Sequence, residues 1–356
     1  MPDSKKQADG DAVPSAADGV PAPGSRWPGV VTGVFEESVT AEFASLTATG
    51  RPIAAPATPY VGEAGSTLDV STGLSYPAKA ERARRNPKVC LLYGDPVGSR
   101  INDQPVVMVQ GFAAVRDADL QKNADRYVAA SIRKLPDATK GAPRFVLKQM
   151  NWYFSRIWIE VTPVRMLWWP DRSLSVAPSE WKVSEGAQFP ASDPPPAGKP
   201  PTAWLAPAPS WREVAAEALV ALPMRDLTVV AGDGFPVCVP VEVVDLDGDG
   251  FVLRLGPGAP VLQGGPSCLT FHGHPEVFTG QENRTFVGSL GSPDPNGGAG
   301  LYRFAGTRVL ADWSKAGGRI RSSLDFWLKG RVLKPRLRAE AARRGQAVPK
   351  VRFRSS

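Results

Sequence analysis

Two hydroxyl residues followed by a basic helix form the pattern in this chain that best suits an anionic ligand. Ser71 and Thr72 end a short alternating segment, and Pro77 then opens a stretch typical of a helix. Lys79 falls in the first turn of that helix, and Arg82 lies three residues further on, on nearly the same face. A helix N-terminus offers unpaired N–H groups and a partial positive charge, so these groups together would hold a phosphate monoester. The spacing fits equally well an ordinary capped helix with a solvent-facing basic side.

The chain contains one structural unit twice, and the two copies differ at this pattern. The segment GRPIAAP at 50–56 has its counterpart GFPVCVP at 234–240, where the glycine and both prolines keep their spacing 184 residues later. A repeat of this length indicates a duplicated domain rather than a solenoid unit. The second copy has Gln263 where Lys79 would be, inside a Gly/Pro stretch. Because a purely structural helix has no evident reason to vanish from one copy only, the asymmetry favours a binding site in the first.

The elements that position these residues are predicted from apolar alternation and turn residues. Asp117 is the predicted N-cap of one helix, and the glycines at 50 and 234 are predicted hairpin turns. Five or six mostly antiparallel strands in each copy indicate a mainly β fold built of small barrels. The expected strands are 42–47, 52–57, 66–71, 89–93, 105–115 and 157–169, then 227–230, 237–244, 250–255, 268–272, 284–290 and 301–313; the expected helices are 35–40, 77–86, 117–131, 144–153 and 211–221.

Length and composition divide the chain into two domains with tails. The 36 prolines and 35 glycines among 356 residues exclude a helix bundle and indicate strands and turns. The expected segments are a disordered tail at 1–25, a first barrel with the binding site at 26–169, a Pro-rich linker at 170–210, a degenerate second barrel at 211–314, and a basic helical segment and tail at 315–356.

The net charge of +7 is distributed unevenly along the chain. Residues 315–356 hold 13 Lys and Arg against two acids, which leaves the rest of the chain mildly acidic. Such a segment suits nucleic acid or an anionic membrane. It lacks regularly interleaved aromatic residues for base stacking, so a solvated helix and tail is favoured and nucleic acid is not an expected partner. Without a leader or an apolar run of about 20 residues, the sequence predicts a cytoplasmic protein with no membrane partner.

Other motifs are interpreted as structural. The segment DLDGDG at 245–250 begins like a calcium loop, but position twelve is Gly256, so a hairpin turn is favoured. His272 and His274 have no third ligand at a suitable spacing, so no metal site is predicted; His272 either ends a strand, which is favoured, or faces a cofactor groove. The remaining candidates are assigned to core packing, and they are Cys90, Cys238, Cys268, Trp168, Trp169 and Trp313.

Taken as a set, several stretches of the first copy resemble the FMN-binding split-barrel superfamily that includes pyridoxamine 5′-phosphate oxidase. They are residues 46–52 (LTATGRP), 69–72 (DVST), 78–89 (AKAERARRNPKV), 106–113 (VVMVQGFA) and the expected strand at 157–169; the second copy resembles the same barrel more faintly. The phosphate-oxidase branch has Arg directly before the helix lysine, where this chain has Ala78, and its strand-two arginine falls near Ala55. The alanines at 54–57 with a lone Lys79 are more similar to the flavin- and deazaflavin-dependent reductases.

This resemblance implies two tandem split β-barrels with inserted helices and a Pro-rich linker between them. Members of the family usually dimerise with flavin between two barrels, so two barrels in one chain would form that pair internally and could act as a monomer. The residues that the resemblance places at the cofactor are Ser71, Thr72 and Lys79 at the phosphate, with Arg82 beside them, and the backbone of Ala55, Pro56 and Ala57 along the ring.

The function implied is that of an oxidoreductase that transfers hydride to or from a small organic substrate. FMN is the expected cofactor, and the deazaflavin coenzyme is the alternative because its acidic tail suits the basic C-terminal segment. A non-enzymatic flavin- or haem-binding module is the rival class. Because the cofactor carries the hydride chemistry in such enzymes, no catalytic residue is assigned.

Overall fold

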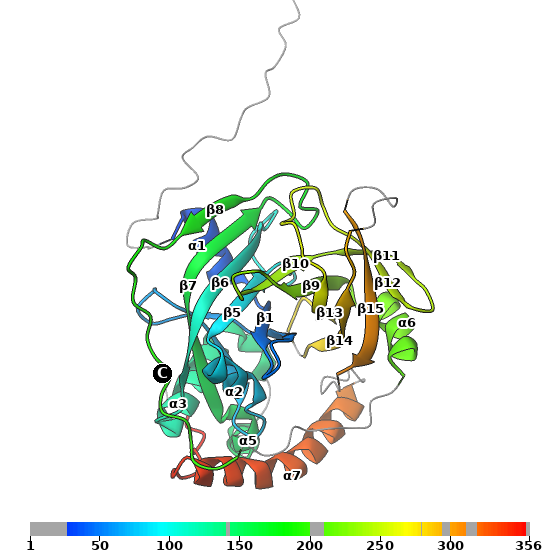
Figure 1. Cartoon of the computed structure of the whole chain (residues 1–356). Helices are drawn as coiled ribbons and strands as arrows, with labels where there is room; N and C mark the ends of the chain where they lie inside the picture. The colour runs from blue at the N-terminus through cyan, green and yellow to red at the C-terminus, as the bar shows by residue number, and fades with distance from the viewer. Residues whose placement is uncertain are drawn as a thin grey trace, which may run out of the picture.

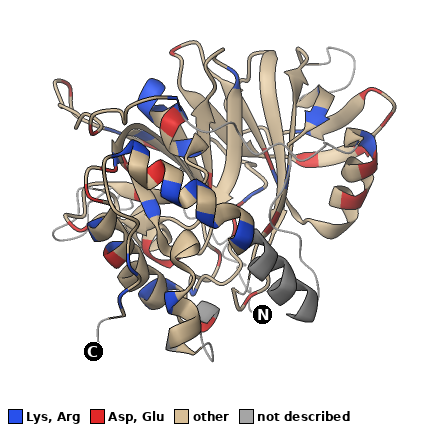
Figure 2. Ribbon diagram, turned by 90° about the horizontal axis from the view of Figure 1, so that it is seen from below, with Lys and Arg blue, Asp and Glu red and all other residues tan. Residues whose placement is uncertain are grey.

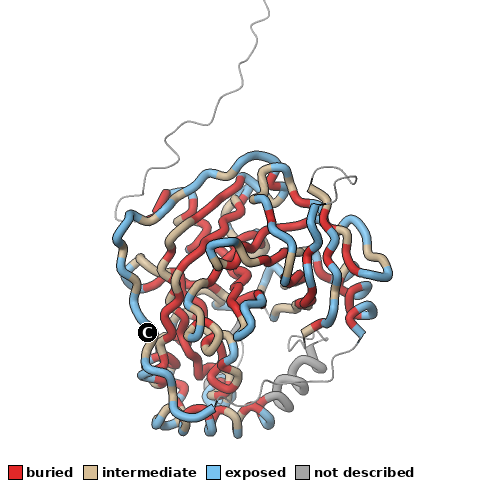
Figure 3. Tube along the Cα trace, viewed as in Figure 1, coloured by how far each residue is buried: buried red, intermediate tan, exposed pale blue. Residues whose placement is uncertain are grey.

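The structure is a computed structural model that describes residues 27–139, 143–199, 210–278, 280–293, 300–310 and 319–353. The tail at 1–25 and Trp313, for which we made predictions, lie outside the described residues. Two curled sheets face each other, with helices on their outer sides and a long helix, α7, along one end (Figure 1). Buried residues concentrate in the strands of both sheets, and exposed residues lie in the loops around them (Figure 3).

The first copy forms one antiparallel sheet. Its strand order is β2-β1-β5-β6-β7-β4-β3, and β8 pairs with β7 outside this path. The strands are β1 (Ala41–Leu46), β2 (Pro52–Ala57), β3 (Tyr60–Val61), β4 (Leu68–Gly73), β5 (Lys88–Tyr93), β6 (Val106–Arg116), β7 (Arg156–Trp169) and β8 (Ser179–Lys182).

The second copy forms a seven-stranded sheet with the order β10-β9-β13-β14-β15-β12-β11. Position by position this is the order of the first sheet, so the duplication is confirmed and the chain is a tandem pair of split barrels. The strands are β9 (Met224–Val230), β10 (Pro236–Pro240), β11 (Glu242–Leu246), β12 (Gly250–Arg254), β13 (Gly265–Gly273), β14 (Glu282–Leu290) and β15 (Leu301–Val309).

The repeated turn explains why its glycine occurs in both copies. Gly50 and Gly234 join the first two strands of their barrels with φ of 75° and 81°, in the left-handed region that glycine adopts without strain. In the first barrel Glu42 then pairs with Pro56, and in the second Asp226 pairs with Pro240. The two hairpins are therefore equivalent in register as well as in sequence.

The two barrels pack face to face within the chain. Strand β2 lies against β13 and β14 of the second copy, and its counterpart β10 lies against β5 and β6 of the first. This exchange is reciprocal, as in a twofold dimer. One apolar core crosses the boundary, because Ala44, Ala54, Cys90 and Leu92 of the first barrel join the core of the second. All three cysteines are buried and free, as predicted.

The helices cover the outer sides of the sheets. They are α1 (Gly29–Glu37), α2 (Ala78–Arg85), α3 (Leu120–Lys134), α4 (Arg144–Lys148), α5 (Asn151–Phe154), α6 (Trp211–Ala221) and α7 (Arg319–Arg343), with a 3₁₀ turn at Pro136–Thr139. Helix α6 packs on β15, while α2 and α3 pack on the first sheet. Among the described helices, none combines the length and apolarity needed to cross a bilayer.

Several predicted boundaries were wrong for identifiable reasons. Asp117 does not cap α3; Asp119 does, accepting the Lys122 N–H at 2.9 Å, because the Asp117 carboxylate binds Arg84 instead. The strand predicted at 237–244 is divided into β10 and β11. The helix predicted at 144–153 is two short helices, α4 and α5, and the one predicted near 35–40 ends at Glu37.

The basic C-terminal segment is docked rather than solvated. Leu333, Leu337 and Ala341 of α7 are buried in the core of the first barrel. Blue basic residues predominate along the part of α7 that the structure describes, where it crosses the underside of the molecule (Figure 2). Part of its charge is paired, because Arg343 and Arg344 both contact Glu81 of α2. Some of the positive charge that suggested an anionic partner therefore serves intramolecular ion pairs.

Candidate functional site

The predicted ring-binding strand, β2, lies at the boundary between the barrels. Its Ala54 N–H is directed at the Sγ of Cys268, at 3.3 Å, and its Ala54 carbonyl accepts the Thr285 hydroxyl at 3.2 Å. Pro56 and Ala57 are buried, and Ala55 is half-buried. The structure thus places all three predicted backbone positions beside the second copy, which is where the resemblance put the cofactor.

Lys79 joins the helix α2 to this strand. Its Nζ donates a hydrogen bond of 3.2 Å to the Pro56 carbonyl. Burial lowers the pKa of the Lys79 ammonium to about 8, against the opposing effect of Glu42 on β1. The sequence placed Lys79 and Pro56 at one site, and the structure brings them together.

Arg82 lies one turn further along α2 and faces β1. Its Nε donates to the Ser45 hydroxyl at 3.0 Å. Burial lowers the pKa of Arg82 to about 10, and the nearby Cys268 of the second copy opposes this shift. Neither Lys79 nor Arg82 forms an ion pair with a carboxylate in the described part of the chain. Two half-buried cations of α2 therefore have neutral acceptors.

The two hydroxyls, Ser71 and Thr72, are neighbours on β4 and so point to opposite faces of the sheet. Thr72 is buried, and its hydroxyl donates to the Tyr76 carbonyl at 3.2 Å in the turn that leads into α2. Ser71 is half-buried and stands opposite Trp158 of β7. Within the described residues neither hydroxyl is hydrogen-bonded to Lys79. We call Ser71, Thr72, Lys79 and Arg82 the phosphate corner; of these residues, Thr72 is hydrogen-bonded to the turn that leads into the helix.

Arg156 is a cation near this corner that the sequence analysis missed. It begins β7 opposite Gly73, and its guanidinium stacks 4.3 Å from the Tyr127 ring and 4.7 Å from the Tyr153 ring. It donates to the Tyr127 hydroxyl at 3.1 Å, while its Nε has no hydrogen-bond partner among the described residues. The sequence around Arg156 gave no signal, because the strand also contains Glu160 and Arg165.

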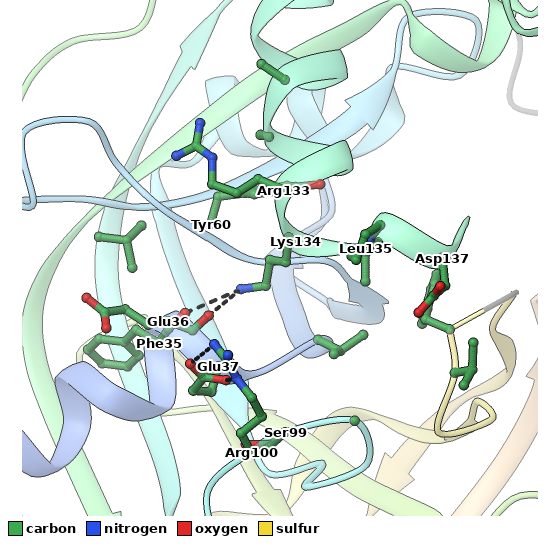
Figure 4. Close-up of a pocket in the computed structure, with 18 of the residues that line it drawn as sticks. Phe35, Glu36, Glu37, Tyr60, Ser99, Arg100, Arg133, Lys134, Leu135 and Asp137 are labelled. Carbon is green, nitrogen blue, oxygen red and sulfur yellow. Dashed lines mark hydrogen bonds and ion pairs between the residues drawn. The ribbon is translucent and has the colours of Figure 1, made fainter. Parts of the chain in front are cut away.

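A cavity of about 900 Å³ lies on another side of the first barrel (Figure 4). The end of α1, the end of α3, Tyr60 of β3 and the loops at 98–100 and 276–278 line it. Arg100 forms an ion pair with Glu37 at 2.6 Å across the cavity, and the Lys134 ammonium donates to the Glu36 carbonyl at 3.3 Å. None of the seven predicted site residues lines this cavity, although Trp158, the cross-strand partner of Ser71, does.

His272 stands one residue before the end of β13, close to the favoured expectation. It lies in β13 with its side chain buried, between carboxylates of β1 and β9. The segment at 245–250 is the predicted hairpin turn: Asp247 accepts the backbone N–H groups of Asp249 and Gly250, at 2.9 and 3.0 Å. The residues around His272 come from strands far apart in sequence, so their spacing gave no signal.

Comparison with known proteins gives partial similarity only. No family model matches the sequence, and no curated protein matches it. The structure is similar to general stress protein 26 from Bacillus anthracis, with 16% identity over 43% of this chain and 96% of that chain, at a TM-score of 0.29. An F420 reductase matches with 17% identity over 37% of this chain and 92% of that chain, at a TM-score of 0.29. A conserved hypothetical protein from Mycobacterium tuberculosis matches with 20% identity over 49% and 98% of the chains, at 0.32. Matches of this strength do not identify a function.

Proposed function

We propose that the chain is an FMN-dependent oxidoreductase whose cofactor lies at the boundary between the two barrels. Lys79 and Arg82 would hold the phosphate with one of the two hydroxyls at the end of β4, since Ser71 and Thr72 point to opposite faces, and the backbone at 55–57 would lie along the ring. The observation that carries the proposal is the pair of half-buried cations on α2 whose hydrogen-bond acceptors are neutral within the described residues.

Electrostatics favours a dianion at this place. A buried cation without a counter-charge is costly, and an opposite charge within a few ångströms removes most of that cost. A phosphate monoester would supply charge of about −2 to Lys79 and Arg82, at the end of a helix whose N–H groups also favour anions. It would replace the present acceptors of these side chains, the Pro56 carbonyl and the Ser45 hydroxyl.

The chain's own residues would bind and orient the cofactor, which supplies the hydride chemistry when bound. The apolar residues around Ala54, together with Cys268 and Thr285 of the second copy, would exclude water from one side of the ring. The second barrel thus acts as a wall for the site of the first. Hydride transfer to or from a small organic substrate is the corresponding activity.

Two alternatives have less support. The deazaflavin coenzyme was considered because of the basic C-terminal segment, but Arg343 and Arg344 of that segment bind Glu81 and Glu340. A haem-binding role would use an axial ligand such as His, Cys, Met or Tyr. Both histidines of the chain, His272 and His274, have buried side chains beside carboxylates, which disfavours histidine in that role.

The test is a parallel titration of the purified chain with FMN and with the deazaflavin coenzyme, in which cofactor fluorescence reports binding. We expect FMN to bind, and Lys79→Ala to weaken it by about 10- to 150-fold, because a hydrogen bond to a charged group contributes about 1.5–3 kcal/mol. Lys122→Ala, a lysine on the outer helix α3, is the matched control and should leave the affinity unchanged.

Arg133→Ala separates this site from the cavity, because Arg133 lines the cavity and not the corner. If Arg133→Ala weakens FMN while Lys79→Ala does not, the phosphate lies in the cavity and the site assignment is wrong. If the unaltered chain binds neither cofactor, the proposed function is wrong.

A further inference from the structure

Buried ionisable side chains meet at the internal dyad, where the two barrels face each other. Glu42 of β1 and Asp226 of β9 occupy equivalent positions of the two copies, 184 residues apart. His272 of β13 lies between them, and its partner across the sheet is Met224 of β9. The equivalent position in the first barrel is Gly94, just after β5, so His272 has no ionisable counterpart there. The side chains of all three are at most 2% exposed.

One imidazole nitrogen is shared by two carboxylates. The Nε2 of His272 is 3.2 Å from Asp226 Oδ2 and 3.5 Å from Glu42 Oε1. The three ligand atoms lie within 4.8 Å of one another. A single N–H cannot satisfy both acids, and neither oxygen of Glu42 has a hydrogen-bond partner among the described residues. A fully buried carboxylate without hydrogen-bond partners is costly, and a cation between these groups would lower that cost.

The other nitrogen of His272 faces a third carboxylate. Its Nδ1 is 3.6 Å from Asp95 Oδ2, and the Nε2 of His274 is 3.3 Å from the same oxygen. The arrangement of a carboxylate behind an imidazole is the one that orients histidine ligands in metal sites. In the present structure the hydrogen bond of the ring runs from Nε2 to Asp226. A cation bound at Nε2 would replace that proton and leave the ring proton on Nδ1, on the side of Asp95.

The cluster has an excess of negative charge. With neutral histidines, Glu42, Asp95 and Asp226 contribute three negative charges, and Arg172 returns one through its bond of 2.9 Å to Asp226 Oδ1. The two negative charges left are only partly offset by the Lys79 ammonium, which lies near Glu42 but hydrogen-bonds to the Pro56 carbonyl. A bound cation would neutralise the remaining excess.

The distances fit a first-row transition ion. Ligand bonds of about 2.0–2.1 Å in a tetrahedron place neighbouring ligand atoms about 3.3–3.4 Å apart, close to the two measured separations. Two carboxylates and an imidazole suit Zn²⁺ better than Mg²⁺ or Ca²⁺, which prefer oxygen ligands. We propose that Glu42, Asp226 and His272 bind a divalent transition metal ion, represented here by Zn²⁺, which ties the two barrels together at their dyad.

This inference does not depend on the proposed flavin site. The metal ligands come from β1, β9 and β13, whereas the phosphate residues lie on β4 and α2. Metal binding and FMN binding can therefore be measured separately, and either can fail without the other. Asp95 and Arg172 are positioning residues in this arrangement, because each contacts a ligand and not the proposed ion.

The experiment uses the full chain, freed of metal by dialysis against a chelator. We expect one Zn²⁺ per chain by elemental analysis after re-addition and desalting, with a Kd of about 1 μM or tighter by calorimetry. Zn²⁺ at about 100-fold above Kd should raise the Tm by at least about 3 °C. Glu42→Gln and Asp226→Asn, which keep the side-chain volume, should each weaken Zn²⁺ by more than about 100-fold, beyond the typical effect of an outer partner.

Asp69→Asn is the matched control, since Asp69 is an equally buried carboxylate that binds Arg126 away from the dyad. It should keep full Zn²⁺ affinity. If the unaltered chain binds no stoichiometric Zn²⁺ below about 100 μM, the two negative charges are balanced by protons and the proposal is overturned. Unchanged Zn²⁺ affinity in a folded Glu42→Gln variant would overturn the proposal as well. If Glu42→Gln does not fold, the same comparison is made with Asp226→Asn, and unchanged Zn²⁺ affinity there would overturn the proposal.

Discussion

Replacing Arg344 by methionine tests how the C-terminal helix is held against the first barrel. The Arg344 guanidinium bonds to Asp117 at 2.9 Å, to Glu81 at 3.3 Å and to Glu340. The side chains of Arg344, Asp117 and Glu340 are at most 3% exposed. Glu81 belongs to α2, the helix that carries Lys79, so the same cluster fixes the predicted phosphate corner.

The magnitude follows from what the substitution leaves behind. Asp117 keeps Arg84 at 2.8 Å, and Glu340 keeps Arg343 at 3.0 Å, but three carboxylates are left with two arginines. Removal of one partner from a buried ionic cluster costs about 3–5 kcal/mol, and the remaining pairs place Arg344→Met near the lower end, at about 3 kcal/mol. Methionine retains the apolar length of the side chain, so lost packing adds little.

The assay is urea unfolding followed by tryptophan fluorescence, with Arg254→Met as control. Arg254 pairs with Glu242 at 2.8 Å, but the two side chains are 49% and 59% exposed, so its loss should cost about 0–1 kcal/mol. The m-value should not change in either variant. Equal and small losses for Arg344→Met and Arg254→Met would refute the conclusion that α7 is fixed by this buried cluster.

Two further predictions concern the corner and the turns. FMN binding should weaken as pH rises past about 8, because Lys79, which lies near Glu42, Arg82 and Arg156 and has a pKa of about 8, then loses its proton. The Lys79→Arg variant should bind FMN independently of pH in that range. An FMN affinity of the unaltered chain that does not change with pH would contradict the assignment. Gly250→Ala should lower the free energy of unfolding by more than about 2 kcal/mol, because its Cβ would lie 1.9 Å from the Phe304 carbonyl oxygen. Gly248→Ala is the control: its Cβ would meet nothing within 4 Å, so the free energy of unfolding should change by less than about 1 kcal/mol. Thermal unfolding of both variants measures the difference.

Local features of the chain were sufficient to predict most of the elements. The repeat around Gly50 and Gly234 predicted two equivalent hairpins, because a tight turn with positive φ needs glycine wherever it occurs. The helix predicted from Pro77 begins one residue later, at Ala78, and the turn at Gly50 predicted β2 at Pro52–Ala57 to the residue. These signals depend only on neighbours in sequence.

The hydrogen-bond and ion-pair partners of several charged side chains could not be predicted from the sequence, because more than one partner was available to each. Asp117 has the chemistry of a helix cap, but Arg84 and Arg344 bind its carboxylate, and Asp119 caps α3 instead. The basic segment looked solvated because nothing in its own sequence indicates that Glu81 and Asp117 lie beside it. Ion pairs between residues distant in sequence leave no periodic pattern. The charge of the segment therefore predicted a solvent-exposed helix, whereas α7 packs against the first barrel.

By itself, then, the sequence determined that one barrel is present twice and that only the first copy has Lys79 at the start of a helix. Folding decided that Lys79 reaches Pro56, and that Glu42, Asp226 and His272 meet at the dyad. The physical reason is that turns and hydrophobic periodicity depend on residues close in sequence. The burial and the charged neighbours of a side chain depend instead on which strands of the two copies pack against each other. A residue's protonation and partners are set by that contact and not by its position in the chain.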